Sequence, residues 1–330
     1  MHLRIKFVKF QYILPAIACF LGSSGCLQSD ATDAKPQADD QGWVLVWADE
    51  FDGTQLDRTK WQPETSCWGG GNDERQCYTD RADNIAVEDG YLTLTAQPEI
   101  FTGPNFPQDF KDRGEQIKQN YTSGKVRTLG RQSWTYGRFE ARIRVPQGQS
   151  AWSAFWMLPQ NNTYGKWPLS GEIDIMEAVN LGAICDDCGA RNSETRSIGA
   201  LHFGQAWPQN KYLTGQYDLG AETFDPEAFY SFAVEWGEGK INWFVDGNLY
   251  FSMDQSQWNT DGVEKTDRPA APFDQPFYVM LNLAVGGNLP DNRNEKTFNP
   301  KSFPAQMQVD WVRVYQCNDD KETGRKCMRD

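Results

Sequence analysis

Histidine is scarce in this chain, which has only His2 and His202 among 330 residues. A zinc site built on several histidines is therefore disfavoured, and a Ser-His-Asp triad would have to use His202. Basic residues are also few, and the formal charge is −13. Nucleic acids and anionic membrane surfaces bind basic footprints, so the charge argues against both partners and weakly disfavours a heavily sulfated polysaccharide.

Long hydrophobic runs are missing apart from one short run near the N-terminus. Residues 1–25 have a basic start, an apolar run and then Gly-Ser-Ser-Gly. This pattern predicts a secretory signal peptide, and the run is too short for a transmembrane segment. Cys26 follows these small residues, which resembles a bacterial lipoprotein processing site. The match is imperfect because Ser23 stands where such sites usually have leucine, so cleavage of the signal peptide nearby, without lipidation, is the alternative. Residues 26–41 are polar and predict a flexible tether.

Most of the eight cysteines fall into close pairs. Cys19 would leave with the signal peptide and Cys26 is the residue left over for a lipid. The other six form three pairs: Cys67/Cys77, Cys185/Cys188 and Cys317/Cys327. An even set in an exported protein predicts disulfides. The second pair could also be a redox or metal site, but a small disulfide-closed loop is favoured because no second such pair and no histidine lies nearby.

No long amphipathic helix and no internal repeat occurs in the sequence. Short alternating runs separated by turn residues recur instead, for example at residues 91–96, 139–145, 232–236 and 241–245. Residues 278–283 form a longer apolar run that suits a central strand. Many strands with almost no helix predict an all-β antiparallel β-sandwich. No break in composition divides the region, so we expect one domain over residues 42–317 and a C-terminal tail over residues 318–330.

Three acids stand close together in residues 171–177, whose sequence is GEIDIME. Alternation predicts a β-strand with Glu172 and Asp174 on its polar face. On an unbroken strand Glu177 would fall on the apolar face, at a high cost for an unpaired carboxylate. A bulge near residues 175–176 would return it to the polar face. Clustered acids raise one another's proton affinity, and a protonated acid beside an ionised one suits glycoside hydrolysis. The alternative is a strand whose acids are merely solvated.

Residues 43–316 resemble glycoside hydrolase family 16, and within it the laminarinase-type endo-β-1,3-glucanases. The strongest match is EIDIME at residues 172–177. Further matches are WADEFD at 47–52, GNDERQ at 71–76, SGKVR at 123–127, YGRFEAR at 136–142, AFWMLP at 154–159, NLAVGG at 282–287 and VDWVRVY at 309–315. The resemblance implies a jelly-roll, concanavalin A-like sandwich with a concave substrate cleft.

The resemblance also assigns roles to residues by their positions in these motifs. Glu172 becomes the nucleophile, Glu177 the general acid/base, and Asp174 the residue that tunes the pair. The candidates for substrate binding are Asn72, Arg127, Trp152, Trp156, Trp167 and His202. For His202, a buried structural role is equally open. Catalysis is expected to need no cofactor. A structural calcium ion would be held by Glu50, the Gly90 carbonyl and Asp310, unless the two acids pair with neighbouring groups.

The sequence therefore predicts an exported, monomeric laminarinase that acts on a polysaccharide, as a secreted or periplasmic enzyme or an outer-membrane lipoprotein. Two alternatives stay in the same family, namely hydrolysis of mixed-linkage glucan or of a marine galactan. The alternative from another class is a carbohydrate-binding protein that has lost catalysis. Retention of all three acids argues against it, because a binder has no need of a mutually repelling trio. Two departures from the family, a loop at residues 183–196 and the lack of a histidine in residues 225–230, leave the preferred chain length open.

Overall fold

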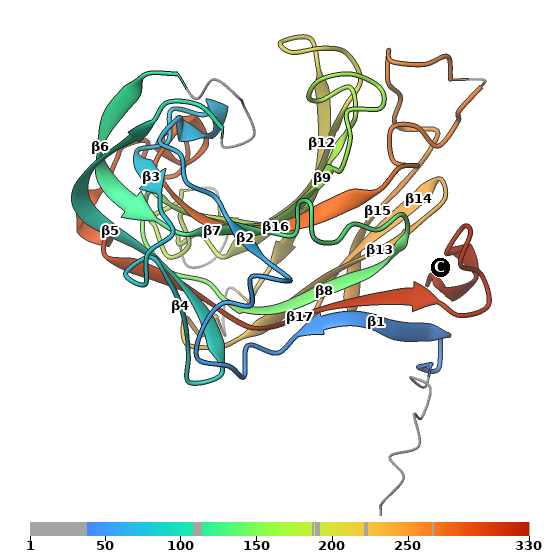
Figure 1. Cartoon of the computed structure of the whole chain (residues 1–330), viewed down its shortest axis with the longest axis horizontal. Helices are drawn as coiled ribbons and strands as arrows, with labels where there is room; N and C mark the ends of the chain where they lie inside the picture. Colours follow the sequence, from blue (N-terminus) through green and yellow to red (C-terminus); the bar gives the residue numbers. More distant parts are fainter. Residues whose placement is uncertain are drawn as a thin grey trace, which may run out of the picture. The chain divides into compact units, whose positions relative to one another are not determined.

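Two β-sheets lie face to face and contain nearly all the regular structure (Figure 1). The computed structural model describes residues 38–107, 114–186, 188, 192–220, 224–265 and 267–329. These residues belong to one compact unit. The predicted all-β sandwich is confirmed, and the predicted signal peptide, Cys26 and most of the tether lie outside the described residues.

The larger sheet has ten strands in the described part of the chain. In order across the sheet, its main path runs through β15 (Asn248–Asp254), β14 (Lys240–Val245), β13 (Tyr230–Gly237), β8 (Gly137–Arg144), β17 (Ala305–Cys317), β5 (Tyr91–Pro104), β6 (Gln116–Ser123) and β3 (Gln76–Tyr78). β1 (Trp43–Asp49) pairs with β17, and β4 (Ile85–Glu88) pairs with β5. Neighbouring strands are antiparallel except β3 and β6, which are parallel.

The smaller sheet has seven strands among the described residues, and it carries the three acids. Its order is β12 (Lys211–Asp218), β11 (Arg196–Phe203), β10 (Glu172–Val179), β9 (Ala151–Pro159), β16 (Phe277–Val285), β7 (Lys125–Arg127) and β2 (Gln62–Pro63). Figure 1 shows this sheet curving, with β12 rising at one rim of its concave side. Strand β16 is buried at every position, as expected for a central strand.

The core fills the space between the two sheets with large aromatic and aliphatic side chains. Phe139, Phe232 and Trp236 come from the larger sheet, and Phe155 and Phe277 from the smaller one, and none of the five is exposed. Alternation along each strand sends these side chains inward and leaves the opposite face of the smaller sheet for polar groups. The core therefore fixes which residues can reach the concave face.

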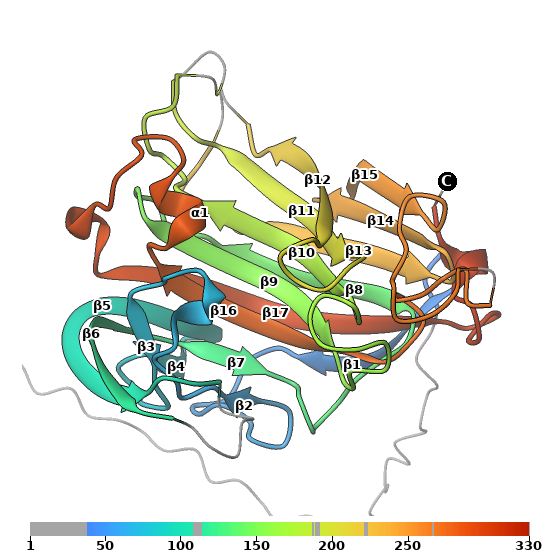
Figure 2. The same cartoon turned by 90° about the horizontal axis from the view of Figure 1, so that it is seen from above.

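In the residues that the structure describes, helical structure is limited to short segments: η1 (Gly69–Gly71), α1 (Asn288–Asp291), η2 (Pro300–Ser302) and η3 (Arg325–Cys327). Figure 2 looks onto the smaller sheet, with α1 at one end of its central strands. Leu289 of α1 packs there against Trp152, Val179 and Ala284. None of the helices in the described ranges is long and apolar enough to cross a membrane.

All three predicted disulfides are present: Cys67–Cys77, Cys185–Cys188 and Cys317–Cys327. The last one ties down the segment that the sequence suggested as a C-terminal tail. Within it, Arg329 donates from its backbone N–H to Glu235 Oε2 at 2.9 Å, and Asn242 donates to the Arg329 carbonyl at 2.7 Å. Residues 318–329 therefore pack onto strands β13 and β14 as part of the domain.

Candidate active site

The acid-bearing strand β10 contains the bulge that the sequence predicted. Its pairing with β9 is regular at Asp174↔Trp156, and the register shifts before Met176↔Phe155 and Glu177↔Ala154. Pairing with β11 shifts over the same residues. Ile173, Ile175 and Met176 are buried in the core. The bulge therefore lets two consecutive apolar residues point inward while Glu172, Asp174 and Glu177 share the concave face.

The residue just before β10 is a glycine for a steric reason. Gly171 has a φ of +84°, and a Cβ at this position would lie 2.8 Å from Cε1 of the Phe273 ring. A side chain here would meet both backbone strain and a clash with the core. Gly171 thus fixes how the chain enters β10 and where Glu172 starts.

Burial and the neighbouring Glu172 carboxylate raise the pKa values of two of these acids, Asp174 and Glu177. Burial, followed by the neighbouring Glu172 carboxylate, raises the pKa of Asp174 well above its ordinary value. Burial also raises the pKa of Glu177 to about 7, with a further increase from Glu172 and an opposing effect from His202. Glu177 can therefore keep a proton near neutral pH, as a general acid must.

His202 lies on the concave face, directly across from Glu172 in the β10–β11 pair. Its Nε2 atom is 3.4 Å from Asp174 Oδ2 and 3.8 Å from Glu172 Oε1. Burial lowers the pKa of His202, but Glu172, Asp174 and Glu177 together outweigh it and raise the value to about 10. The imidazole is thus a cation at neutral pH and offsets part of the negative charge of the trio.

Two tryptophans donate hydrogen bonds to the two glutamates. Trp167 Nε1 donates to Glu172 Oε2 at 2.7 Å, and Trp152 Nε1 donates to Glu177 Oε1 at 3.0 Å. Trp167 is 42% exposed, whereas Trp152 is buried. The structure therefore brings both residues to the acids: Trp152 is buried and holds Glu177, whereas Trp167 is partly open to solvent.

Trp156 lies beside Asp174 in the sheet and is held by a buried polar chain that sequence analysis missed. Its Nε1 donates to Asn282 Oδ1 at 2.7 Å, and Asn282 Nδ2 donates to the Tyr78 hydroxyl at 3.1 Å. Lys125 Nζ lies 5.0 Å from the centre of the Trp156 ring. These contacts join residues far apart in sequence. The only sign of them in the sequence was that Asn282 and Lys125 lie in motifs shared with the family.

Arg127 and Asn72 lie in less direct positions. Arg127 is 2% exposed, and its Nη1 is 3.6 Å from Glu64 Oε2, which also pairs with Lys125 Nζ at 3.1 Å. The Asn72 carbonyl accepts a hydrogen bond from the Asn288 N–H at 2.7 Å, which ties it to the start of α1. Arg127 thus lies in strand β7 of the smaller sheet, and Asn72 lies beside the start of α1. The substrate contacts of both residues stay a prediction.

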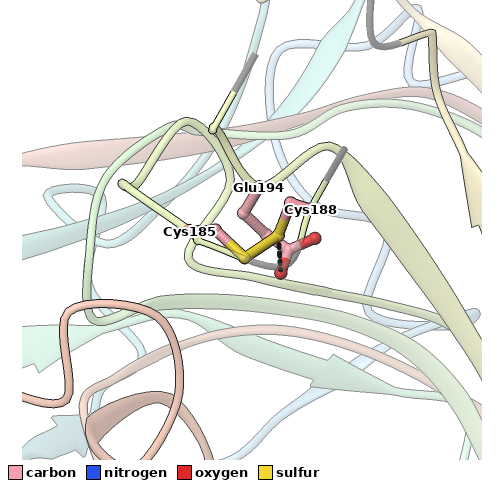
Figure 3. Close-up of side chains that lie close together, drawn as sticks. All are labelled: Cys185, Cys188 and Glu194. Atoms are coloured by element: carbon pink, nitrogen blue, oxygen red, sulfur yellow. Dashed lines mark hydrogen bonds between the residues drawn. A yellow bond between two sulfur atoms is a disulfide. The ribbon is translucent and has the colours of Figure 1, made fainter. Parts of the chain in front are cut away.

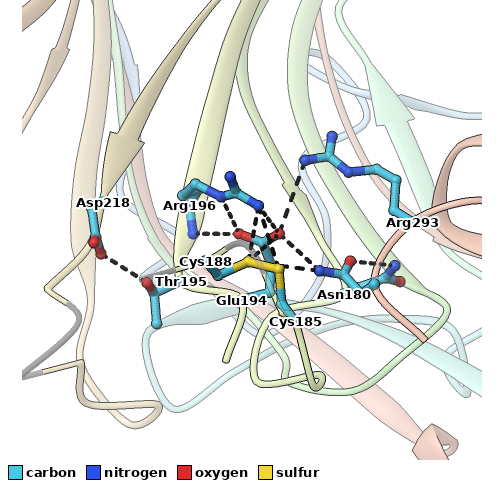
Figure 4. The surroundings of a disulfide bond; sticks show 9 residues. Asn180, Cys185, Cys188, Glu194, Thr195, Arg196, Asp218 and Arg293 are labelled. Atoms are coloured by element: carbon cyan, nitrogen blue, oxygen red, sulfur yellow. Dashed lines mark hydrogen bonds and ion pairs between the residues drawn. A yellow bond between two sulfur atoms is a disulfide. The ribbon is translucent and has the colours of Figure 1, made fainter. Parts of the chain in front are cut away.

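The loop between β10 and β11, which contains a disulfide, also contains a buried carboxylate, that of Glu194. Figure 3 shows the Cys188 Sγ beside Glu194, at 3.3 Å from Oε2. Arg196 donates to both carboxylate oxygens of Glu194 at 2.8 Å (Figure 4). Asn294 donates to Oε2 at 2.9 Å. The two sulfurs are bonded to each other, as the sequence favoured, and in this oxidised form they offer no thiolate to a metal ion.

The proposed calcium ligands do not present a fitting donor set. Glu50 accepts two hydrogen bonds of 2.8 Å from Arg313, and Asp310 forms an ion pair with Arg142. Calcium is bound by several free oxygen ligands, so an ion here would have to displace both guanidinium groups. The structure thus follows the other possibility raised by the sequence, in which the two acids pair with neighbouring groups.

An acid cluster on the concave face of a jelly-roll sandwich is the arrangement of a carbohydrate-hydrolysing enzyme. The family model described as "Beta-porphyranase A-D, GH16 domain" matches residues 43–317. The chain therefore belongs to glycoside hydrolase family 16, and it is a glycoside hydrolase.

Named relatives agree with this assignment. The chain is 39% identical to glucan endo-1,3-beta-glucosidase A1 of Niallia circulans, over 83% of this chain and 38% of that protein. It is 38% identical to the beta-glucanase of Rhodothermus marinus, over 88% of this chain and 91% of that protein. The crystal structure of the laminarinase from Rhodothermus marinus matches with a TM-score of 0.66 at 35% identity, covering 83% of this chain and 97% of that one.

Proposed function

We propose that the protein is a retaining endo-glycosidase that hydrolyses β-1,3-glucan, with Glu172 as nucleophile and Glu177 as general acid/base. The observation that carries the proposal is the acid cluster on β10, in which one carboxyl has a pKa raised to about 7 beside others on the same face. Such a pair can donate a proton and attack carbon in the same site. The names of the relatives at 38–39% identity support the glucan as substrate.

In the first step, a Glu172 oxygen attacks the anomeric carbon while the bond to the leaving sugar breaks. The protonated Glu177 gives its proton to the leaving oxygen, and a glycosyl ester forms on Glu172. In the second step, Glu177 takes a proton from a water whose oxygen attacks the anomeric carbon and releases the Glu172 carboxylate. Two inversions leave the product in the β configuration.

Neighbouring groups support each step. The His202 imidazolium, 3.8 Å from Glu172 Oε1, stabilises the carboxylate that leaves in the second step. Trp167 and Trp152 orient the two glutamates through their indole N–H groups. Asp174, whose pKa is raised, limits the negative charge between them. The rings of Trp167, which is exposed, and Trp156, which is partly buried, could offer flat apolar surfaces to sugar rings.

A side-by-side assay tests the substrate. Reducing sugar released from laminarin, barley mixed-linkage glucan, agarose, porphyran and κ-carrageenan would be measured with the purified full chain. We expect laminarin to be cleaved fastest, and proton NMR of early products to show the β-anomer first. An α-anomer formed first would refute the retaining mechanism, whereas faster cleavage of barley glucan would refute strict β-1,3 specificity.

A galactan is the second candidate, because the family model that matches is described by beta-porphyranases. A sulfated chain would need cations free to bind it. Lys125 and Arg127, which lie on the concave side of β7, are both near Glu64, and the charge without residues 1–25 would be −16. These features favour a neutral glucan, and faster cleavage of porphyran or agarose than of laminarin would reverse that choice.

We infer that the protein is exported, since three disulfides form and persist in oxidising compartments. Lipidation of Cys26 stays a prediction, because this residue lies outside the described part of the chain. Intact-mass analysis of protein from a bacterial membrane fraction would detect an acylated Cys26. A soluble form that begins at another residue would refute the anchor.

A further inference from the structure

The concave face continues past the acids onto the edge strand β12. Tyr212 pairs directly with His202 across the β11–β12 ladder, so the two side chains leave the same face of the sheet. The His202 ring stacks on Tyr212 at 5.6 Å between centroids and an angle of 29°. The same imidazole also packs against Trp167, at 5.9 Å between ring centroids. His202 therefore links two aromatic rings, that of Trp167, the hydrogen-bond partner of Glu172, and that of Tyr212.

Both of these aromatic side chains are exposed to solvent. Tyr212 is 64% exposed although it is a large aromatic residue, and Trp167 is 42% exposed. Tyr217 of the same strand differs, because it packs against the core and against Tyr250 at 5.5 Å. Tyr212 thus contributes little to the core, while its contact with His202 limits how its ring can move.

An exposed tyrosine can simply be a surface residue, since scattered apolar groups are common on protein surfaces. Tyr212 departs from that pattern because its stacking partner is the imidazole that contacts Glu172 and Asp174. Sugar rings have an apolar C–H face that aromatic rings cover, and a tyrosine adds a hydroxyl that can bond sugar hydroxyls. Continuity with the acid cluster therefore identifies the occupant as the polysaccharide itself.

We propose that Tyr212 is a substrate-binding residue, and that its ring forms a separate sugar subsite on the β11–β12 side of the catalytic strand. The proposal rests on the proposed function for the kind of sugar. Strand β12 lies two strand spacings from β10, roughly 10 Å away. Tyr212 should therefore contact a unit beyond the two sugars joined by the cleaved bond, so longer chains gain affinity from it.

Three variants of the full chain test the subsite, with kinetics on laminari-oligosaccharides of increasing length. Tyr212→Ala should raise KM for the longer chains by about three- to ten-fold with kcat unchanged, and the effect should shrink for the shortest substrate cleaved. Tyr212→Phe, which keeps the ring, should stay within about two-fold of the wild type. Leu213→Ala is the matched control, because this neighbour is also exposed but points to the opposite face of the strand.

Equal KM values for Tyr212→Ala and wild type on every chain length would overturn the subsite. An equal loss in Leu213→Ala would do the same, because it would mean general damage to the edge strand. If the wild type fails on laminarin but cleaves another polysaccharide, the glucan assignment falls, and the three variants are compared on oligomers of that polysaccharide. There the same rise in KM for Tyr212→Ala would support the subsite, and its absence would overturn it.

Discussion

Glu177 lies in β10, and Glu194 lies at the other end of the loop that connects β10 to β11. The environments of the two side chains shift their pKa values in opposite directions. Glu194 is the more deeply buried, with its side chain 1% exposed, whereas Glu177 remains partly exposed. Burial raises the pKa of Glu194, but hydrogen bonds from Arg196 and Asn294 outweigh it and lower the value. The pKa of Glu177 is raised to about 7, since burial acts there together with the charge of Glu172.

The comparison shows that burial raises the pKa of both glutamates, and that hydrogen-bond partners decide whether this effect is outweighed. Glu194 accepts charge-assisted hydrogen bonds on both oxygens, which favours the ionised form. Glu177 accepts one neutral hydrogen bond, from Trp152, and shares its face with two further acids. The Glu194 environment suits a structural anchor, and the Glu177 environment suits a proton donor.

The largest expected effect comes from Glu177→Ala, which removes the proton donor. Hydrolysis of laminarin should fall by about 10²- to 10⁴-fold. On an aryl β-laminaribioside, whose leaving group needs no acid, added azide should restore turnover and give a β-azide, because azide attacks the intermediate without a general base.

Glu194→Ala is the control for this experiment, and its activity should not respond to azide. Product analysis by NMR would distinguish the two anomers. An α-azide, or no rescue in Glu177→Ala, would contradict the role of Glu177.

A smaller effect is expected on stability from Glu194→Gln. The amide cannot neutralise the Arg196 guanidinium, so the free energy of unfolding at pH 7 should fall by about 1–3 kcal/mol. The control is Glu227→Gln, which breaks an ion pair with Arg144 in which the glutamate side chain is 76% exposed. This variant should change stability by less than about 1 kcal/mol. Urea unfolding checks both, and equal losses would remove the distinction between the buried and exposed pairs.

The two glutamates should also give opposite pH dependences of stability. The folded-state pKa of Glu177 lies above the unfolded value, so the proton that it holds stabilises the fold at low pH and this contribution is lost as pH rises toward 7. Glu194 has a lowered pKa, so its contribution is present at neutral pH and is lost as pH falls below the ordinary range of a glutamate.

Amide variants would separate these contributions. The Tm of Glu177→Gln minus the Tm of wild type should be more positive at pH 8 than at pH 4. The reason is that the glutamine never acquires the unfavourable negative charge that Glu177 acquires as pH rises. The Tm deficit of Glu194→Gln should instead shrink from pH 7 to pH 3. Thermal unfolding followed by circular dichroism across this range is the measurement, and slopes of the same sign would contradict the comparison.

The smallest effect is expected on the pH profile of activity, from substitution of Arg293, whose charge acts on both Glu177 and Glu194. Its Nη2 is 3.9 Å from Glu194 Oε2, and its charge lowers the pKa of Glu177. Arg293→Gln should therefore move the upper pH limit of kcat/KM to higher pH, while Arg293→Lys should keep the wild-type profile. Unchanged profiles in both variants would show that Arg293 does not influence the acid/base group.

Local sequence pattern was sufficient for the fold class and for the acids. Alternation identified the strands, and the cost of an inward Glu177 required the bulge that the β9–β10 register contains. Sequence spacing also gave the three disulfides, because each pair of cysteines is separated by ten residues or fewer. These features depend on interactions between residues close in the chain, so the sequence by itself determined them.

Only the tertiary structure decided which distant groups meet the acids. The β10–β11 register placed His202 against Asp174, and the β11–β12 register placed Tyr212 on His202. Arg313 donates hydrogen bonds to Glu50, an acid that the sequence predicted as a calcium ligand. A one-residue change of register would send each of these side chains to the other face of its sheet, and register across long loops is fixed by the whole core, which no local pattern encodes.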